Sequence, residues 1–186
     1  MILNLAKRRK TVRNFKPEIP PLDDILYAIK TAKEAPSGMN SQPWYFLIIA
    51  DNLMKEKIKK IAESAEKIFY ENSKGKLKDF LIKNKITWEK NFLSSAPYLI
   101  LVFSDIRFPF SKESTWLSIG YFLLALEEKK LSTVTYTPPK PSEIGKIVNA
   151  PKFYKLEVIL PVGYSNDSKK KQNRKKVDEI VSYNIL

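Results

Sequence analysis

The sequence predicts a single domain of mixed helices and strands, either α/β or α+β. The chain has 186 residues, a length that suits one domain. Hydrophobic residues make up 44% of it and charged residues 28%, which is ordinary for a soluble globular protein. Helical patterns alternate along the chain with four short apolar runs that are typical of buried strands.

Two helices are predicted in the N-terminal part of the chain. Residues 3–10 form a short helix with Asn4 as its candidate cap. Residues 22–34 follow two prolines, carry acidic residues in the first turn and place apolar residues on one face, so they form a second helix. The next segment, residues 35–43, is rich in Pro, Gly, Ser and Asn and is predicted to be a loop.

The middle of the chain is predicted to run strand, helix, helix, strand. Residues 44–50 are a short apolar run and form the first strand. Residues 52–72 have apolar side chains at helical spacing, and residues 74–76 then interrupt the helix. A further helix over residues 77–94 leads to a second strand at residues 97–104.

The last third of the domain contains two more helices and two more strands. Residues 112–129 form a helix that is apolar nearly all round, so we expect it to be buried on several sides. Gly120 in its middle costs helix stability, which suggests a close packing neighbour. The β-branched residues 131–137 form a strand, residues 141–149 a short helix and residues 156–162 the last strand.

The chain contains no Cys and no His. This excludes disulfides, thiolate nucleophiles, Ser-His-Asp triads and metal sites built on Cys or His. We therefore expect no metal site. No glycine-rich dinucleotide or P-loop motif is present either. If the protein is an enzyme, a bound cofactor is expected to supply the demanding chemical step.

The net charge of +13 is concentrated in two short segments. Residues 1–16 and residues 169–176 each hold six basic residues and no acidic one, while the remainder holds 21 basic and 20 acidic residues. Three interpretations are open: two solvated tails, an anion site built from both ends, or a nucleic-acid-binding patch. No apolar run approaches the length of a membrane span, and Met1–Ala6 is too short for a signal peptide, so we expect a soluble, cytoplasmic protein without a membrane contact.

Four motifs occur in a fixed order. They are Arg9-Lys10-Thr11-Val12-Arg13-Asn14-Phe15, the loop APSGMNSQPW at residues 35–44, VTYTP at residues 134–138, and LPVGY at residues 160–164 followed by RKKVDEI at residues 174–180. Together they resemble the FMN-dependent nitroreductase superfamily. The middle and C-terminal half, with the segment at residues 87–101, is most similar to its iodotyrosine deiodinase branch, the flavin-dependent reductive dehalogenases.

The resemblance implies a specific architecture. The fold would be α+β and nitroreductase-like, with a central, mostly antiparallel sheet flanked by helices. Residues 1–186 would form a single FMN-binding domain, within which residues 66–95 make an active-site lid and residues 164–186 a C-terminal extension. The protein would be a domain-crossed homodimer with FMN at the subunit interface.

The resemblance also implies which residues bind FMN. They are Arg9, Lys10, Thr11, Val12, Arg13, Pro36, Ser37, Gly38, Asn40, Thr135, Tyr136, Thr137 and Arg174. Arginine and lysine form charge-assisted hydrogen bonds to phosphate, and in the family the first motif and the late arginine meet there. Lys10 departs from the more usual arginine. The turn at residues 36–38 would come from the partner subunit.

Three of these residues also allow ordinary structural interpretations. Arg13 is expected at the pyrimidine end of the flavin, but it could equally form a structural ion pair. Asn40 could instead satisfy backbone groups of its loop. Thr137 is the candidate catalytic residue, because in the deiodinase branch a hydroxyl at this place hydrogen-bonds flavin N5 and favours one-electron steps. Thr137 could also be an ordinary threonine at a strand end.

Three further residues match the substrate-binding lid of the deiodinase branch. Glu66 and Tyr70 are four apart and share one helix face, and Lys90 follows in the second half of the lid. A free amino acid is a zwitterion, so it needs a carboxylate for its ammonium and a cation for its carboxylate. The backbone N–H of Met39 would contact the substrate phenolate. The alternative for the three lid residues is an ordinary solvated helix face.

These features favour FMN-dependent reductive dehalogenation of halogenated tyrosine, with NAD(P)H or another reductant as the electron donor. One alternative is a generic NAD(P)H-dependent nitroreductase or quinone reductase. Another is a basic nucleic-acid-binding module, against which the near-neutral body of the chain counts.

Overall fold

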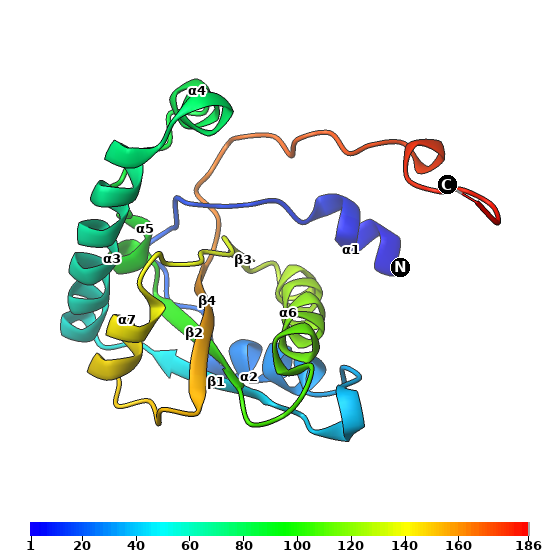
Figure 1. Ribbon diagram of the computed structural model, residues 1–186, viewed down its shortest axis with the longest axis horizontal. Helices are drawn as coiled ribbons and strands as arrows, with labels where there is room; N and C mark the ends of the chain where they lie inside the picture. Colours follow the sequence, from blue (N-terminus) through cyan, green and yellow to red (C-terminus); the bar gives the residue numbers. More distant parts are fainter. Residues whose placement is uncertain (186) are drawn as a thin grey trace.

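The computed structural model describes residues 1–185 and contains one four-stranded sheet with helices on both faces (Figure 1). The strands are β1 (Trp44–Ile49), β2 (Tyr98–Asp105), β3 (Ser132–Thr133) and β4 (Tyr154–Gly163). Their order in the sheet is β1-β2-β4-β3, and every neighbouring pair is antiparallel. The predicted α+β fold with a mostly antiparallel sheet is confirmed.

Strand β2 lies inside the sheet and supplies side chains to both of its faces. Successive residues of a strand point to opposite faces. Leu99 and Leu101 therefore belong to one apolar core, and Ile100 and Val102 belong to the other. All four side chains are fully buried, which explains why this strand reads as a continuous apolar run in the sequence.

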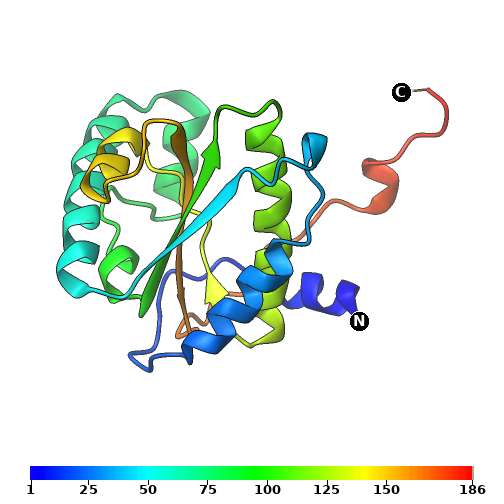
Figure 2. The same ribbon diagram turned by 90° about the horizontal axis from the view of Figure 1, so that it is seen from below.

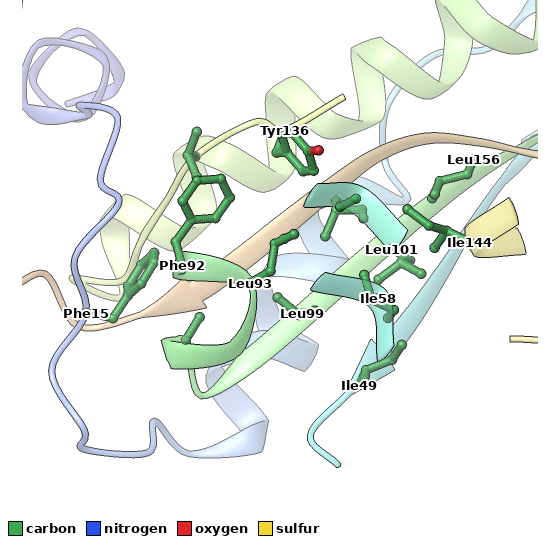
Figure 3. Packing of buried hydrophobic residues seen from close by; sticks show 14 of the residues in the cluster. Phe15, Ile49, Ile58, Phe92, Leu93, Leu99, Leu101, Tyr136, Ile144 and Leu156 are labelled. Atoms are coloured by element: carbon green, nitrogen blue, oxygen red, sulfur yellow. The ribbon is translucent and has the colours of Figure 1, made fainter. Parts of the chain in front are cut away.

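The first core lies under α3 (Asn52–Asn72), α5 (Phe92–Ser95) and α7 (Pro141–Ile147). Asp51 caps α3, because its carboxylate accepts the Met54 N–H at 2.7 Å. Figure 3 shows Ile58 of α3, Leu93 of α5 and Ile144 of α7 gathered over strand β2. Burial of this apolar stripe holds α3, the helix that carries Glu66, against the sheet.

The second core lies under α2 (Leu22–Ala32) and α6 (Ser111–Glu128), which cover the other face of the sheet (Figure 2). The Ser118 hydroxyl of α6 donates to the Ala32 carbonyl of α2 at 2.9 Å. The expectation that α6 is buried on several sides is met only in part, because Leu117 is half exposed. Gly120 has no atom within 4 Å of the place where a Cβ would sit, so its expected close neighbour is not found in residues 1–185.

The segment after α1 and the segment after β4 lie side by side. Helix α1 (Ile2–Arg8) is followed by an extended segment that pairs with the chain after β4, where Lys16 N–H donates to the Tyr164 carbonyl. Beyond this contact the chain leaves the body of the molecule and makes a short 3₁₀ turn, η2 (Val177–Glu179) (Figure 1). Leu186, the last residue of the predicted extension, lies outside the described residues. None of the helices formed by residues 1–185 is long and apolar enough to cross a membrane.

The predicted helix over residues 77–94 is wrong in its middle. Helix α4 (Gly75–Lys83) ends early, and α5 forms separately after an irregular stretch. Lys85 adopts the left-handed conformation with φ 51°, and the Ile86 N–H turns back to the Leu81 carbonyl at 2.9 Å. This is a Schellman ending, which glycine normally marks in a sequence. A lysine in that position gives no such signal.

Two other expectations also differ in detail. Helix α1 begins at Ile2, so Asn4 lies inside the helix and is not its cap. The strand expected over residues 131–137 is reduced to the two residues of β3. Ser132 and Thr133 pair with Gly163 and Val162 of β4, and Tyr136 bridges Ile159 of the same strand in the same register. The ladder is interrupted between them, where residue 134 stands opposite Pro161, which has no N–H to donate.

Candidate active site

A cavity of about 750 Å³ opens between α3, the irregular stretch after α4 and the segment after β3. Its volume lies within the usual range of small-molecule sites, about 300–1,000 Å³. Six of the predicted site residues line it: Arg13, Glu66, Lys90, Thr135, Tyr136 and Thr137. The cavity therefore brings together residues that were assigned separately to the cofactor and to the substrate.

A smaller cavity of about 220 Å³ adjoins the first and shares Arg13, Asn84, Ile86 and Lys169 with it. Its lining includes six basic residues from the two charged segments: Lys10, Arg13, Lys169, Lys170, Lys171 and Arg174. Thr11 lines it as well. The two basic ends of the sequence thus meet around one hollow, as an anion site built from both ends requires.

Arg9 lines neither cavity, but it lies close to Arg174, which lines the basic one, and it has free hydrogen-bonding capacity. Its Nε and Nη2 atoms are buried and have no hydrogen-bond partner. Burial, and then the charge of Arg174, lower the pKa of Arg9, while Glu127 opposes the shift. A buried cation without a partner is costly, and a bound anion would relieve that cost. The site therefore fits a phosphate dianion, which arginine binds by charge-assisted hydrogen bonds.

Lys10 and Lys171 join the two basic segments to each other. The Lys10 ammonium donates to the carbonyls of Asp167 (2.6 Å) and Lys169 (2.7 Å). In return, Lys171 Nζ donates to the carbonyls of Ala6 and Lys7 in the last turn of α1. A cation at a helix C-terminus is stabilising. Lys10 therefore shapes the cavity, in addition to lining it.

The predicted lid residues Glu66 and Lys90 form an ion pair. Lys90 Nζ lies 3.1 Å from Glu66 Oε2, and the two side chains are only 8% and 13% exposed. Lys90 Nζ also donates to the Thr87 carbonyl at 2.6 Å. Tyr70 behaves differently, since it is half-buried on α3 but lines neither cavity.

Tyr136 places a buried hydroxyl in the wall of the larger cavity. Its backbone N–H and carbonyl both bond to Ile159 of β4, and its ring packs edge-on against Phe92 at 5.6 Å (Figure 3). The hydroxyl has no hydrogen-bond partner. Burial, then the charge of Glu66 and the nearness of its carboxylate to the hydroxyl, and then the charge of Glu63 raise the pKa of Tyr136 well above its ordinary value. This hydroxyl therefore stays protonated and can donate.

Thr137 follows Tyr136 and is exposed at the cavity wall. The next residue, Pro138, is buried and has no backbone N–H. A ligand group at this position would therefore meet the Thr137 side chain without competition from the amide of residue 138.

The predicted loop residues Pro36, Ser37, Gly38, Met39 and Asn40 lie away from both cavities. The loop stands at the end of α6 that is remote from α1 (Figure 2), where the Gly38 N–H donates to Ser114 Oγ at 3.2 Å. Residues 38–40 form the 3₁₀ turn η1 (Gly38–Asn40), and the Met39 side chain is 81% exposed. None of these five residues lines the cavity of its own chain.

Five further residues belong to the site or support it and were not predicted: Phe69, Asn84, Ile86 and Lys169 line the larger cavity, and Glu63 binds the Lys90 backbone. Lys169 belongs to the basic run, and Glu63 stands three residues before Glu66, which places both on one helix face. Those two could have been found from charge and spacing. Asn84 and Ile86 reach the site only because α4 ends early, so no local signal points to them.

Comparison with known proteins agrees with this geometry. The model of the nitroreductase family matches residues 6–164. Iodotyrosine deiodinase of Thermotoga neapolitana is 56% identical over 186 residues, which cover 100% of this chain and 99% of the relative. The chain belongs to the nitroreductase family, in its iodotyrosine deiodinase branch.

Further relatives extend the comparison. Iodotyrosine deiodinase of Nematostella vectensis is 33% identical, with 94% of this chain and 72% of the relative covered. A crystal structure of oxidised iodotyrosine deiodinase bound to FMN and 3-iodo-L-tyrosine superposes with a TM-score of 0.97 at 55% identity, with both chains fully covered. A BluB-like flavoprotein from Clostridium difficile 630 follows at 26% identity and a TM-score of 0.81, with 98% of each chain covered. The family resemblance read from the four motifs is confirmed.

Proposed function

We propose that this protein is an FMN-dependent reductive dehalogenase of halogenated tyrosine. The observation that carries the proposal is the match over the whole chain to a solved protein described with FMN and 3-iodo-L-tyrosine bound. The two adjoining cavities support it, because one is basic and the other holds a carboxylate and an ammonium side by side.

The basic cavity is where FMN would be anchored. Arg9 and Arg174 would take the phosphate, because Arg9 has free buried donors and Arg174 uses only Nη1 in its bonds to Gln172 and Asn173. Thr11 and Arg13 would continue the site towards the larger cavity. When bound, FMN supplies the electrons for reduction. NAD(P)H or another donor would reduce the bound FMN.

We also propose that the protein is cytoplasmic. A chain without Cys forms no disulfides and is therefore compatible with the reducing conditions of the cytoplasm.

The larger cavity would hold the amino acid end of the substrate. Glu66 would accept the substrate ammonium, and Lys90 would donate to the substrate carboxylate. One ion pair in the free enzyme would thereby become an alternating set of four charges in a water-poor site, where each attraction is strengthened. Tyr70, one turn beyond Glu66, would join them when the lid over residues 66–95 closes.

The chemical balance of the reaction is simple. The aryl carbon–halogen bond breaks, halide leaves, and the ring carbon takes up a proton while two electrons enter the ring. Thr137 would hydrogen-bond the cofactor at the reacting end, and the protonated Tyr136 hydroxyl would remain a donor in the cavity wall throughout. Exclusion of water by the lid would protect the reduced state.

The site is proposed to be completed by a second copy of the chain. The loop at residues 36–40 lies away from the cavity of its own chain, and Met39 projects outward. Helix α6 exposes Leu117 and Tyr121 and leaves open space over Gly120. A homodimer that covers this face would bring the loop of one subunit to the flavin of the other, where the Met39 N–H would meet the substrate phenolate.

An anaerobic titration of the reduced holoenzyme with 3-iodotyrosine tests the proposal. We expect flavin reoxidation with one iodide and one tyrosine formed per flavin.

Thr137→Ala should slow iodide release by about tenfold or more, the loss expected for one hydrogen bond that acts in the transition state, and Thr137→Ser should restore it. Reduction of nitroaromatics or quinones with no iodide release would instead support the generic reductase.

A further inference from the structure

Glu63 stands on α3 one turn before Glu66, with its side chain half-buried on the same face. Its Oε1 atom accepts the backbone N–H of Lys90 at 2.7 Å. This hydrogen bond joins α3 to the irregular stretch between α4 and α5. A bond from an N–H to a carboxylate is charge-assisted and stronger than a bond between neutral groups.

Lys90 is consequently held at every polar group that it has. Its N–H is bound by Glu63, its carbonyl accepts the Leu93 N–H at 2.8 Å, and its ammonium is bound by Glu66 and the Thr87 carbonyl. An ammonium has three donors, so one of them is left for a ligand. The side chain is 8% exposed, and the residue lines the larger cavity.

The anchor at Glu63 matters because the surroundings of Lys90 are otherwise irregular. Asn84 and Lys85 end α4, and α5 begins only at Phe92, so no helix or strand holds residues 86–91. Glu63 comes from a helix that is packed on the sheet core through Ile58 and Ala62. Two carboxylates of α3 therefore bind Lys90: Glu66 at its side chain and Glu63 at its backbone.

We infer that Glu63 is a positioning residue that fixes Lys90 for the carboxylate of the amino acid substrate. The inference rests on the proposed function, in which Lys90 receives that carboxylate. If Glu63 is absent, the Lys90 backbone loses its hydrogen bond to α3, and the position of the Lys90 ammonium in the cavity becomes variable. Ligands that carry a carboxylate would then bind less tightly, whereas the affinity of ligands without a carboxylate would stay the same.

The test measures ligand affinity in the oxidised FMN holoenzyme by quenching of flavin fluorescence. The probes are 3-iodotyrosine, 3-(4-hydroxy-3-iodophenyl)propionate, which lacks the ammonium, and 3-iodotyramine, which lacks the carboxylate. Glu63→Ala should raise the Kd of the two carboxylate probes about tenfold, as expected for one lost hydrogen bond to a charged group, and leave the Kd of iodotyramine within about twofold. Glu63→Gln keeps an acceptor oxygen and should restore most of the affinity. Glu56→Ala, at an exposed position of the same helix, is the matched control.

Two results would overturn the inference. An equal loss for all three probes would mean that Glu63 only supports the lid, and a larger loss for iodotyramine would mean that its charge acts on the ammonium directly. If Glu63→Ala does not retain FMN, Glu63→Asp, whose carboxylate is one methylene shorter, takes its place with the same expected selectivity.

A measurement without ligand separates this inference from the proposed function. Amide hydrogen exchange of Lys90 should be slow in the wild-type holoenzyme and in Glu63→Gln, and about tenfold or more faster in Glu63→Ala, since the opening free energy falls by the strength of the bond. Unchanged exchange would refute the tether. Failure of every probe to bind the wild-type protein, with the exchange result intact, would refute the proposed substrate and leave the tether standing.

Discussion

The Tyr136 hydroxyl is a buried polar group that the protein itself does not satisfy. An unpaired buried hydroxyl costs free energy in the absence of ligand. The raised pKa adds a dependence on pH, because the unfolded chain can ionise this tyrosine near its ordinary value while the folded chain cannot. The free energy of unfolding is therefore unaffected by this ionisation below about pH 10, and it falls as the pH rises above that value.

Tyr136→Phe should therefore change stability in two ways. At pH 7 the ligand-free protein should be unaffected or more stable by about 1 kcal/mol, because an unsatisfied group is removed. Above about pH 10 the variant should lose less stability than the wild type, because one group that ionises only in the unfolded state is gone. Thermal melting between pH 8 and 11 measures both effects. Parallel losses in the two proteins would contradict the raised pKa.

Gly163, the last residue of β4, stands where neighbouring side chains leave no room for a larger residue. A Cβ there would lie 2.7 Å from Pro97 Cδ and 3.2 Å from Phe15 Cδ1. Neither ring can yield easily, so overpacking should lower the free energy of unfolding in Gly163→Ala by about 1–3 kcal/mol.

Gly145→Ala is the matched control for this prediction. Gly145 lies in α7, where a Cβ would make only an ordinary contact of 3.9 Å with Ala150. The gain in helix propensity should raise stability by up to about 1 kcal/mol. Urea denaturation measures both variants, and a neutral Gly163→Ala would show that the end of β4 can shift.

At the scale of elements, the segment after α1 and the segment after β4 act as one unit. Lys10 and Lys171 reach across in opposite directions, and the backbone of Asn166 pairs with Asn14. These bonds hold the two positively charged segments close together despite their mutual repulsion. Such a unit is stable only because the carbonyl acceptors are close, and a bound phosphate would stabilise it further.

Arg9→Met should separate binding from stability in this unit. The substitution replaces an unpaired buried cation by an apolar side chain, so the FMN-free protein should keep or raise its melting temperature. The Kd for FMN should rise by about tenfold or more, because a charge-assisted contact to phosphate is lost. Lys175→Met, at an exposed position of the C-terminal basic run, is the control. A large fall in stability without FMN would show that Arg9 is satisfied within the protein.

At the scale of the whole molecule, apolar side chains on one face of α6 and in the loop at residues 36–40 stay exposed in the described part of the chain. Leu117 is half exposed on this face, and Met39 is almost fully exposed beyond it. Contiguous exposed apolar surface is typical of protein interfaces, which is consistent with the proposed assembly. The proposed homodimer would bury it and complete each flavin site.

Leu117→Lys tests the assembly. We expect the wild-type protein to be a dimer by light scattering, and the variant to be largely monomeric and to lose FMN, because a charge is placed in the interface. Leu53→Lys, an exposed position at the start of α3, should leave both properties unchanged. A wild-type monomer that retains FMN would contradict the proposal.

The positions of the elements could be predicted from the sequence because their signals are local. The period of apolar residues marked α2 and α3, a long stretch that is apolar nearly all round marked α6, and the apolar run marked β2. The family followed from short segments in a fixed order. The prediction failed at Lys85, where a left-handed residue that is not glycine ends α4.

What the sequence alone determined is therefore most of the helices and strands, the α+β class, the family and the concentration of charge at the two ends. Only the tertiary structure decided which donors and acceptors meet. Lys10 is bound to carbonyls more than 150 positions along the chain, Arg9 is left without a partner, and Glu63 ties Lys90 to the core. The physical reason is that hydrogen-bond satisfaction depends on every group that folding brings near, whereas periodicity depends only on neighbours in the chain.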